Sequence, residues 1–380
     1  MSTVPSSLLQ TVDRIATTIV ASQADGVDRE AAFPRASLDA LASEGLMGLL
    51  SAKDVGGLGL GPGAAVAVVE RIARECGSTA MVLTMHYAGT AVLEKFASET
   101  VRRDVAAGRH LSTLAFSEAG SRSHFWAPMG TAKSAAGAKG ASVVLDAQKS
   151  FVTSATNATA YVWSSRPLEA EGASTLWLVP RDAKGIAPAQ PFDGTGLCGN
   201  DSRPVAATAV TIPASQMLGK DGEGFTIMLN HVLPLFNLMN AGVSLGLMES
   251  ATARTAAHAS STRYAHLGSA LAELPTVRAY VARMRVQTDA TRTLLADSVA
   301  AVETGREDAM LRVLECKAAA AESALDVLAR AMRVCGGAAY RRENAIDRLF
   351  RDAQASSVMA PTTDQLYDFI GKAVCGLPVF

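Results

Sequence analysis

The chain has few aromatic residues, few charges and no concentration of positive charge, and each shortage excludes a class of protein. Aromatic residues make up 5% of the 380 residues and charged residues 19%, whereas hydrophobic residues reach 49%. The formal net charge is −1, and Lys and Arg form no run. A nucleic-acid-binding surface needs a concentrated basic face, so we expect none. A chain this apolar can build a large core, and disorder is not expected.

Metal-site and disulfide patterns are also missing. The five cysteines are odd in number and contain no CxxC pair: Cys76, Cys198, Cys316, Cys335 and Cys375. We therefore expect reduced thiols and a cytoplasmic protein. The six histidines have no metal-ligand spacing, and HExxH, GxSxG and Walker-type motifs are absent. The sequence predicts no metal site and gives no local support to a hydrolase, a metalloenzyme or an NTPase.

Long hydrophobic runs are absent as well. No uninterrupted apolar stretch approaches about 18 residues, so we expect no membrane-spanning helix. Apolar residues in the first 23 positions recur at helical spacing among polar ones. This pattern predicts an amphipathic helix rather than a signal peptide.

The patterning changes twice along the chain. Residues 1–110 have helical periodicity, and a glycine-rich turn precedes Pro62 at a predicted helix start. Short apolar runs separated by Gly, Pro, Asp and Asn fill 111–215 and predict an antiparallel sheet or small barrel. Long helical patterns with short links return in 216–380 and predict an antiparallel bundle. This order indicates an α+β fold.

Two segments of the central region suit a flavin. Ser117–Ser123 follows a predicted strand, and its small and hydroxyl residues suit a flavin pyrimidine edge or a phosphate, or form an ordinary polar loop. Phe151 and Thr153 share one face of the next strand. That pair suits a ring to stack on and a polar edge to bind, or a half-buried strand.

Two glycine motifs allow a plainer interpretation. Residues 59–64 fit GxGxxA, but neither a preceding strand nor an acidic residue about 20 positions later is present, so a turn and helix start are predicted. Gly336-Gly337 ends a long helix, where a glycine pair is a normal cap and also allows close approach to a cofactor.

The order of these motifs resembles the acyl-CoA dehydrogenase superfamily over nearly the whole length. Ser117–Ser121 is similar to the family's TEP…GS loop, and Lys149–Ala155 resembles its KxFxTxA strand. Val210–Pro213 with Gly222–Phe225 resembles the entry to the bundle. The C-terminal signature is matched by Gly336-Gly337, Arg351-Asp352 and Pro361-Thr362. The resemblance implies an N-terminal helical domain, a central antiparallel β domain and a C-terminal four-helix bundle, with boundaries near residues 110 and 215.

The resemblance also implies FAD, with FMN as the alternative, between the β domain and the bundle of a homotetramer or dimer. Ser117 is expected at the pyrimidine end, Ser121 at a phosphate, and Phe151 and Thr153 at the ring. Arg263 is expected to reach the pyrophosphate across a subunit interface. The expected cofactor-binding set is Ser117, Ser121, Phe151, Thr153, Arg263, Arg333, Gly336, Gly337, Thr362 and Asp364.

The family's catalytic base is missing. Most members carry a glutamate before the C-terminal Gly-Thr, where this chain has Ala360. The other family position for a base, beside the RxxFG arginine, is matched by Tyr264. The family's D..R pair aligns with Pro234 and Asn237. Alanine cannot accept a proton, and loss of a positioned base costs about 10²–10⁴-fold in rate.

Several functions stay open at this point. A branch of the family without this glutamate oxygenates small organic substrates with O₂ and reduced flavin from a partner reductase. His124, Trp126, His86 and Tyr87 are the candidates to contact substrate in such a site. The alternatives are a dehydrogenase with a base elsewhere, with Glu118, Glu249 and Asp364 as distant candidates, a non-redox acyl-CoA- or flavin-binding homologue, and a non-catalytic scaffold.

Overall fold

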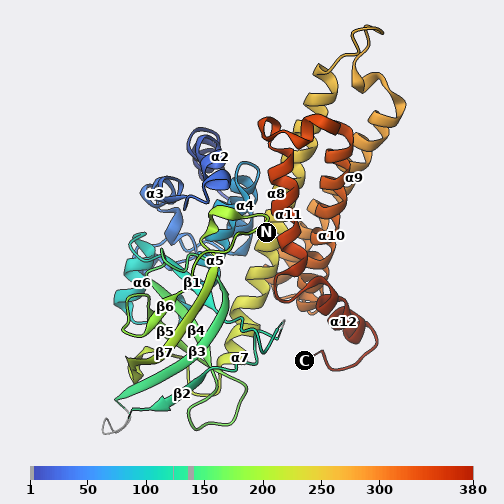
Figure 1. Cartoon of the computed structure of the whole chain (residues 1–380). Helices are drawn as coiled ribbons and strands as arrows, with labels where there is room; N and C mark the ends of the chain where they lie inside the picture. The colour runs from blue at the N-terminus through green and yellow to red at the C-terminus, as the bar shows by residue number, and fades with distance from the viewer. Residues whose placement is uncertain (1–3, 123, 136–140, 380) are drawn as a thin grey trace.

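The computed structural model describes residues 4–122, 124–135 and 141–379, so Ser123 of the predicted polar loop lies outside the described residues. Helices from both ends of the chain flank a β region, and the C-terminal helices form a long bundle that projects beyond the rest (Figure 1). The predicted α+β fold is therefore confirmed.

The N-terminal helices enclose an apolar core and begin where the sequence provides a start signal. Pro62 lies in the first turn of α4, after extended Gly61, and Ser98 caps α6 by accepting a hydrogen bond from the N–H of Val101. Gly56 and Gly59 have positive φ in the preceding turn, which confirms a turn rather than a nucleotide fingerprint. The helices are α1 (Ser6–Ile15), α2 (Ala21–Arg29), α3 (Arg35–Ser43), α4 (Pro62–Ala73), α5 (Gly77–Phe96) and α6 (Glu99–Ala106).

The β region contains two four-stranded sheets, in the orders β1-β4-β5-β8 and β2-β3-β7-β6. All pairs are antiparallel except β1 and β4, which are parallel. Fully buried Tyr161, Trp163 and Trp177 lie in the core that the two sheets share. The strands are β1 (Ser112–Ala115), β2 (Thr131–Ser134), β3 (Ser142–Val152), β4 (Ala160–Ser165), β5 (Thr175–Pro180), β6 (Ile186–Pro188), β7 (Arg203–Pro213) and β8 (Met217–Leu218).

The bundle is built around α10, which contacts α8, α9, α11 and α12. A π-helical turn at Met228–Val232 joins α7 to α8. Gly246 lets α8 approach α4 closely, because a Cβ at this position would lie 2.3 Å from the carbonyl oxygen of Glu70. The helices are α7 (Gly224–Ile227), α8 (Leu233–Ser261), α9 (Pro275–Thr304), α10 (Ala309–Cys335), α11 (Ile346–Val358) and α12 (Thr363–Val374).

One helical stretch within the described residues, Gly224–Ser261, is long and apolar enough to cross a membrane by length and composition. No membrane-spanning helix was expected, because the sequence contains no uninterrupted apolar run of about 18 residues. Single polar residues such as Asn237 and Ser244 interrupt the apolar runs of this stretch without lowering its mean hydropathy below 1.2 over the best window. Since 83% of that window is buried inside the protein, the stretch has the environment of a core helix.

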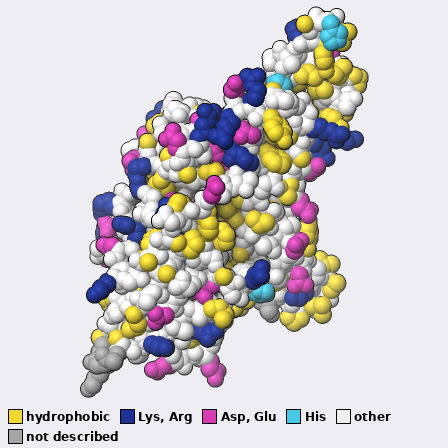
Figure 2. Space-filling view, viewed as in Figure 1, with side chains coloured by type: hydrophobic (Ala, Val, Ile, Leu, Met, Phe, Trp, Pro, Cys, Tyr) yellow, Lys and Arg dark blue, Asp and Glu magenta, His cyan; other side chains and the backbone are white. Residues whose placement is uncertain are grey.

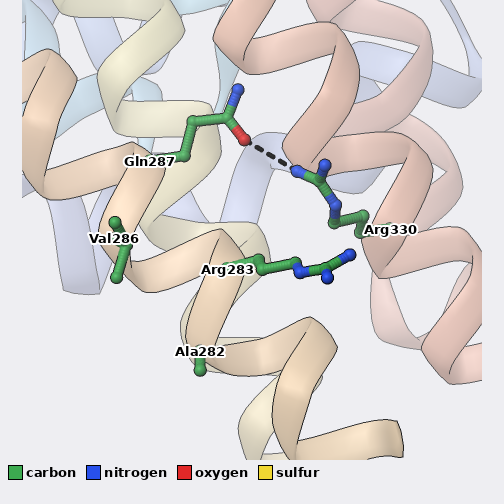
Figure 3. Close-up of a pocket in the computed structure, with 5 residues that line it drawn as sticks. All are labelled: Ala282, Arg283, Val286, Gln287 and Arg330. Carbon is green, nitrogen blue, oxygen red and sulfur yellow. Dashed lines mark hydrogen bonds between the residues drawn. The ribbon is translucent and has the colours of Figure 1, made fainter.

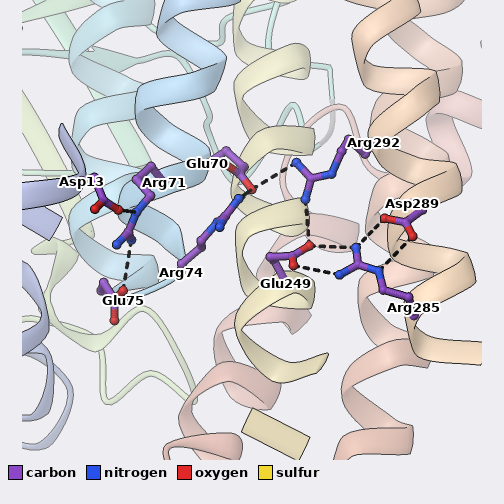
Figure 4. A network of polar contacts seen from close by, with 9 residues as sticks. All are labelled: Asp13, Glu70, Arg71, Arg74, Glu75, Glu249, Arg285, Asp289 and Arg292. Atoms are coloured by element: carbon purple, nitrogen blue, oxygen red, sulfur yellow. Dashed lines mark hydrogen bonds and ion pairs between the residues drawn. The ribbon is translucent and has the colours of Figure 1, made fainter. Parts of the chain in front are cut away.

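Ion pairs join the N-terminal helices to the bundle across its side (Figure 4). Glu249 on α8 accepts from Arg285 and Arg292 of α9 at 2.8 Å. Arg292 lies 3.5 Å from Glu70 of α4, which also pairs with Arg74. The arginines lower the pKa of Glu249 to about 2. These ion pairs fix α9 against α8, and they engage both oxygens of the carboxylate that the sequence offered as a distant candidate base.

Candidate active site

A cavity of about 980 Å³ lies where the β region, α5 and the bundle meet. Its walls come from the loop after β1, the end of β3, the loop before β7, α8 and the segment after α11. Met81 and Met85, one turn apart on α5, complete the apolar part of the lining. The volume and the mainly apolar walls are those of a small-molecule site.

The end of β3 presents an aromatic ring to this cavity. Phe151 is 63% exposed and stacks on Phe192, with ring centroids 4.7 Å apart. The Thr153 hydroxyl lies 3.1 Å from that of Ser202. A register shift between Lys149 and Val152 interrupts the β3–β7 ladder, and Ser154 follows with φ +57°. Irregular strand ends and positive φ at non-glycine residues are frequent at functional sites.

A buried ion pair anchors the loop after β1 to β3. Lys149 Nζ donates to Glu118 Oε1 at 2.6 Å and to Ser164, while Glu118 Oε2 accepts from the N–H groups of Met129 and Gly130 at 2.9 Å. Burial lowers the pKa of Lys149 to about 8, and Glu118 opposes this shift. Both oxygens of the Glu118 carboxylate are engaged in these contacts, so Glu118 holds the loop and is not free to act as a base.

The loop before β7 is fastened by α11. Asp352 is buried and its Oδ1 accepts from the N–H of Leu197 at 2.7 Å, while Arg351 donates to the carbonyl of Thr195. Burial raises the pKa of Asp352 to about 6. Arg348, one turn before Asp352 on the same helix, pairs with Asp25 at 3.2 Å. The arginine–aspartate motif therefore supports a cavity wall.

Residues that the sequence singled out at distant positions lie together on this cavity. Ser117, Phe151, Thr153 and Thr362 line it, and Ala360 lines it beside Thr362. These positions are distant in the sequence, and the chain crossing from the β region to the bundle brings them together.

Other members of the predicted cofactor set lie outside the lining. Ser121 is buried, and its hydroxyl donates to the carbonyl of Glu118 at 3.3 Å. Asp364 is exposed in the first turn of α12, after Thr362, which caps that helix.

The remaining predicted cofactor-binding residues lie at the end of the bundle that is far from the cavity. The cavity residue Leu233 begins α8, and Arg263 and Tyr264 follow its last residue. A rise of 1.5 Å per residue separates them by roughly 40 Å. Arg333 packs over Tyr280, and Gly336-Gly337 ends α10 near Thr255 of the same end. Within one chain, these residues cannot contact a ligand that lies on Phe151.

His86 and Tyr87 were wrong as candidates for substrate contact. Both are fully buried on α5, and neither lines the cavity. His86 accepts from the N–H of Ser112 at Nδ1 and contacts the Met47 carbonyl at Nε2, while the Tyr87 hydroxyl donates to Leu46. Burial lowers the pKa of His86 to about 4. Both side chains hold α5 to neighbouring segments of the same chain, and their polar atoms already have backbone partners.

The aromatic stretch 124–126 packs against the bundle. Trp126 lies edge-on to His124 and Phe125, and its ring centroid is 5.8 Å from that of Phe369 in α12. His124 is exposed, and neither His124 nor Trp126 lines the cavity, whereas Phe125 does.

Sequence reasoning missed two charged residues of the lining, Arg122 and Asp193. Asp193 is exposed on the loop before β7 and carries no motif that could identify it. Arg122 lies in the predicted polar loop at φ +50°, one residue from the predicted phosphate contact Ser121. Among the described lining residues, Asp193 and the paired Glu118 are the carboxylates.

A second hollow of about 430 Å³ lies on the outer side of the bundle (Figure 3). Ala282, Arg283, Val286 and Gln287 of α9 face Arg330 of α10, which donates to Gln287. This hollow is shallow and contains none of the residues predicted from motifs. We therefore take the larger cavity as the functional site.

Known proteins match the chain over nearly its whole length. The model of the acyl-CoA dehydrogenase N-terminal domain matches residues 6–108, and that of the C-terminal domain matches residues 222–375. The human mitochondrial short-chain specific acyl-CoA dehydrogenase is 27% identical over 94% of this chain and 86% of that protein.

Solved structures show the same fold. Butyryl-CoA dehydrogenase from Megasphaera elsdenii superimposes with a TM-score of 0.91 at 19% identity, covering 99% of both chains. A structure described as the FAD complex of PigA superimposes with a TM-score of 0.89 at 17% identity, covering 99% of this chain and 98% of that one.

Proposed function

This chain belongs to the acyl-CoA dehydrogenase superfamily, and we propose that it is an FAD-dependent oxidoreductase that acts on a small organic substrate without a base at position 360. The substrate and the flavin ring share the cavity between the β region and the bundle. The reaction we favour is oxygenation by O₂, with reduced flavin supplied by a partner reductase.

The residues present fit a flavin. The cavity of about 980 Å³ has room for a fused ring system, and the Phe151 ring is exposed to it. Apolar Leu233 and Phe236 lie on the bundle side, and the hydroxyl residues Ser117 and Thr153 lie on the β side. In this arrangement Phe151 packs on the ring, while the hydroxyls bind its polar edge. When bound, the flavin supplies the electron pair that the side chains of this cavity cannot.

The observation that carries the proposal is the carboxylate inventory of the cavity. Ala360 occupies the wall where the family's proton acceptor is expected. The Glu118 carboxylate is bound by Lys149 and two backbone N–H groups, and Asp193 is exposed on the loop before β7. Removal of an α-proton needs a base within hydrogen-bond reach. Oxygenation avoids that step: one oxygen atom enters the substrate, the other leaves as water, and reduced flavin provides two electrons.

We also propose that a second copy of the chain completes the cofactor site, as a homotetramer or a dimer. Arg263 lies roughly 40 Å along the bundle from its own cavity, with Gly336 toward the same end, so both would serve the cavity of another subunit. Hydrophobic side chains gather on the projecting end of the molecule (Figure 2). Leu267 in that region is 64% exposed, which suits contact with a partner.

A rapid-mixing experiment tests the reaction type. Purified protein is loaded with FAD, reduced under anaerobic conditions, and mixed with air-saturated buffer. Oxygenation predicts that reoxidation passes through a transient absorbance distinct from oxidised flavin, and that ¹⁸O₂ labels the product when amines, phenols or sulfur compounds are supplied. Direct return to oxidised flavin without labelled product contradicts it.

A dehydrogenase with a non-standard base is the second candidate. Asp193, which lines the cavity, is the carboxylate that this function would need. Anaerobic bleaching of the bound flavin by butyryl-CoA, lost in Asp193→Asn, would favour it. A protein that binds acyl-CoA but takes up no FAD would instead favour the non-redox alternative.

A further inference from the structure

The segment that carries Ala360 is irregular backbone between α11 and α12. Met359, Ala360, Pro361 and Thr362 all line the cavity. Carbonyl groups outside helices and strands need donors when they are buried. The donors for this segment come from elsewhere in the bundle.

Lys317 of α10 supplies them. Its side chain has no exposed surface, and Nζ donates to the carbonyls of Ser356 at 3.2 Å, Met359 at 3.1 Å and Pro361 at 2.7 Å. These contacts use all three hydrogens of an ammonium group. Among the described residues no carboxylate pairs with Lys317, and burial lowers its pKa to about 7. The charge is balanced by the carbonyl dipoles of one segment.

A second set of hydrogen bonds joins the end of α11 and Met359 to α8. Ser356 donates to Oδ1 of Asn240 at 2.6 Å, and its oxygen also contacts the hydroxyl of Ser244 at 3.0 Å. Asn240 Nδ2 lies 3.5 Å from the sulfur of Met359. Two helices of the bundle therefore hold the segment from behind, on the side away from the cavity.

We propose that Lys317 is a positioning residue that fixes the Met359–Thr362 wall of the cavity, and through that wall sets how a flavin and its substrate fit, although Lys317 contacts neither. This inference rests on the proposed function for the identity of the ligand. An unpaired buried ammonium is expensive in a bundle core. A lysine that only filled space could be replaced by methionine with a loss of stability and no effect on the cavity.

The test compares Lys317→Met with Val327→Ala in the full chain. Val327 is fully buried on the same helix, so its truncation provides a matched loss of core packing. Each protein is titrated with FAD by fluorescence quenching, and hydrogen exchange of residues 356–363 is followed without flavin. We expect Lys317→Met to speed exchange in this segment at least 10-fold and to weaken FAD binding at least 5-fold. Val327→Ala should change thermal stability and leave both quantities within 2-fold of wild type.

Lys317→Gln provides a second variant that keeps two donors and should fall between wild type and Lys317→Met. If Lys317→Met does not fold well enough to be purified, Lys317→Gln provides the comparison with Val327→Ala. Equal changes in exchange and FAD affinity for Lys317→Gln and Val327→Ala, at equal loss of melting temperature, overturn the proposal. Absence of FAD binding by wild type refutes the proposed function instead, while the exchange rates still report whether Lys317 orders the segment.

Discussion

At the scale of a single residue, Ala360 separates the two candidate reactions. We expect Ala360→Glu to accelerate anaerobic flavin reduction by butyryl-CoA by roughly 100-fold or more, because it restores a proton acceptor to the cavity wall. Ala360→Gln has the same shape and no basicity, so it should not accelerate the reaction. The measurement is the loss of flavin absorbance after mixing. Equal slow rates in both variants would mean that residue 360 does not face the reacting carbon.

Phe151 is the residue whose contribution should appear in binding and not in stability. Its ring is 63% exposed, so truncation removes little from the core. Aromatic stacking is worth about 0.5–1.5 kcal/mol, and Phe151→Ala should therefore weaken FAD binding roughly 3- to 10-fold. Fluorescence titration measures the affinity, and urea unfolding should shift by less than about 1 kcal/mol. Val374→Ala, also exposed, is the control that should change neither.

At the scale of elements, the loop after β1 depends on its attachment to β3. Lys149→Met leaves the Glu118 carboxylate buried with two N–H donors and no cation. Breaking a buried pair in this way costs about 3–5 kcal/mol of the free energy of unfolding. Addition of Glu118→Gln removes the stranded charge and should recover at least half of that loss in urea unfolding. Additive losses in the double variant would indicate that the two groups act independently.

Element identities followed from the sequence where patterns were long and had clear ends. Pro62 marked the start of α4, and the helices α8 to α12 all lie within residues 216–380, where helical patterns predicted a bundle. Strands β2, β6 and β8 were not predicted, because two to four residues carry too little periodicity to detect. The parallel pairing of β1 with β4 was missed since pairing direction depends on the path of the whole chain.

The site was foreseen in part for a related reason. Ser117, Phe151 and Thr153 lie at or just after strand ends and carry their own local signal, and the structure brings them onto one cavity. Lys317 and Asp193 gave no signal, because their surroundings come from segments distant in the sequence. His86 misled because a histidine beside a tyrosine suggests chemistry, whereas burial and backbone partners explain it.

At the scale of the whole molecule, buried histidines should make the fold sensitive to acid. Burial lowers the pKa values of His86 and His110 to about 4, so between pH 6.5 and 4 the unfolded chain binds protons that the folded chain does not. The free energy of unfolding should fall over this interval, by on the order of 3 kcal/mol for His86. Asp352 acts in the opposite direction, because burial raises its pKa to about 6 and the folded chain therefore holds a proton that the unfolded chain loses.

His86→Gln isolates the histidine contribution. The variant lacks the titrating ring, so its unfolding free energy should change less between pH 7 and 4.5 than that of wild type in urea titrations. Identical pH slopes for the two proteins would show that His86 does not control acid sensitivity.

The distribution of predicted residues over the bundle has a consequence for assembly. Arg263 lies exposed at the far end, where its guanidinium donates to the carbonyl of Gly268 at 3.1 Å. We expect Arg263→Ala to weaken FAD binding about 10-fold only where chains associate, because in the proposed assembly the arginine would reach another subunit's cavity. FAD titrations at protein concentrations above and below the dissociation point, fixed by analytical ultracentrifugation, measure this. An equal effect in the monomer would exclude a role across an interface.

The π-helical turn at Met228–Val232 has a consequence for how this cavity can diverge. Such a turn closes on i→i+5 hydrogen bonds and so holds one residue more than an α-helical turn, while the helix on either side keeps its facing. Val232 and Leu233 border the cavity, while the rest of α8 is locked in the bundle. Loss of one residue at this turn would therefore restore α-helical spacing and change only the side chains that border the cavity, while the scaffold stays in register.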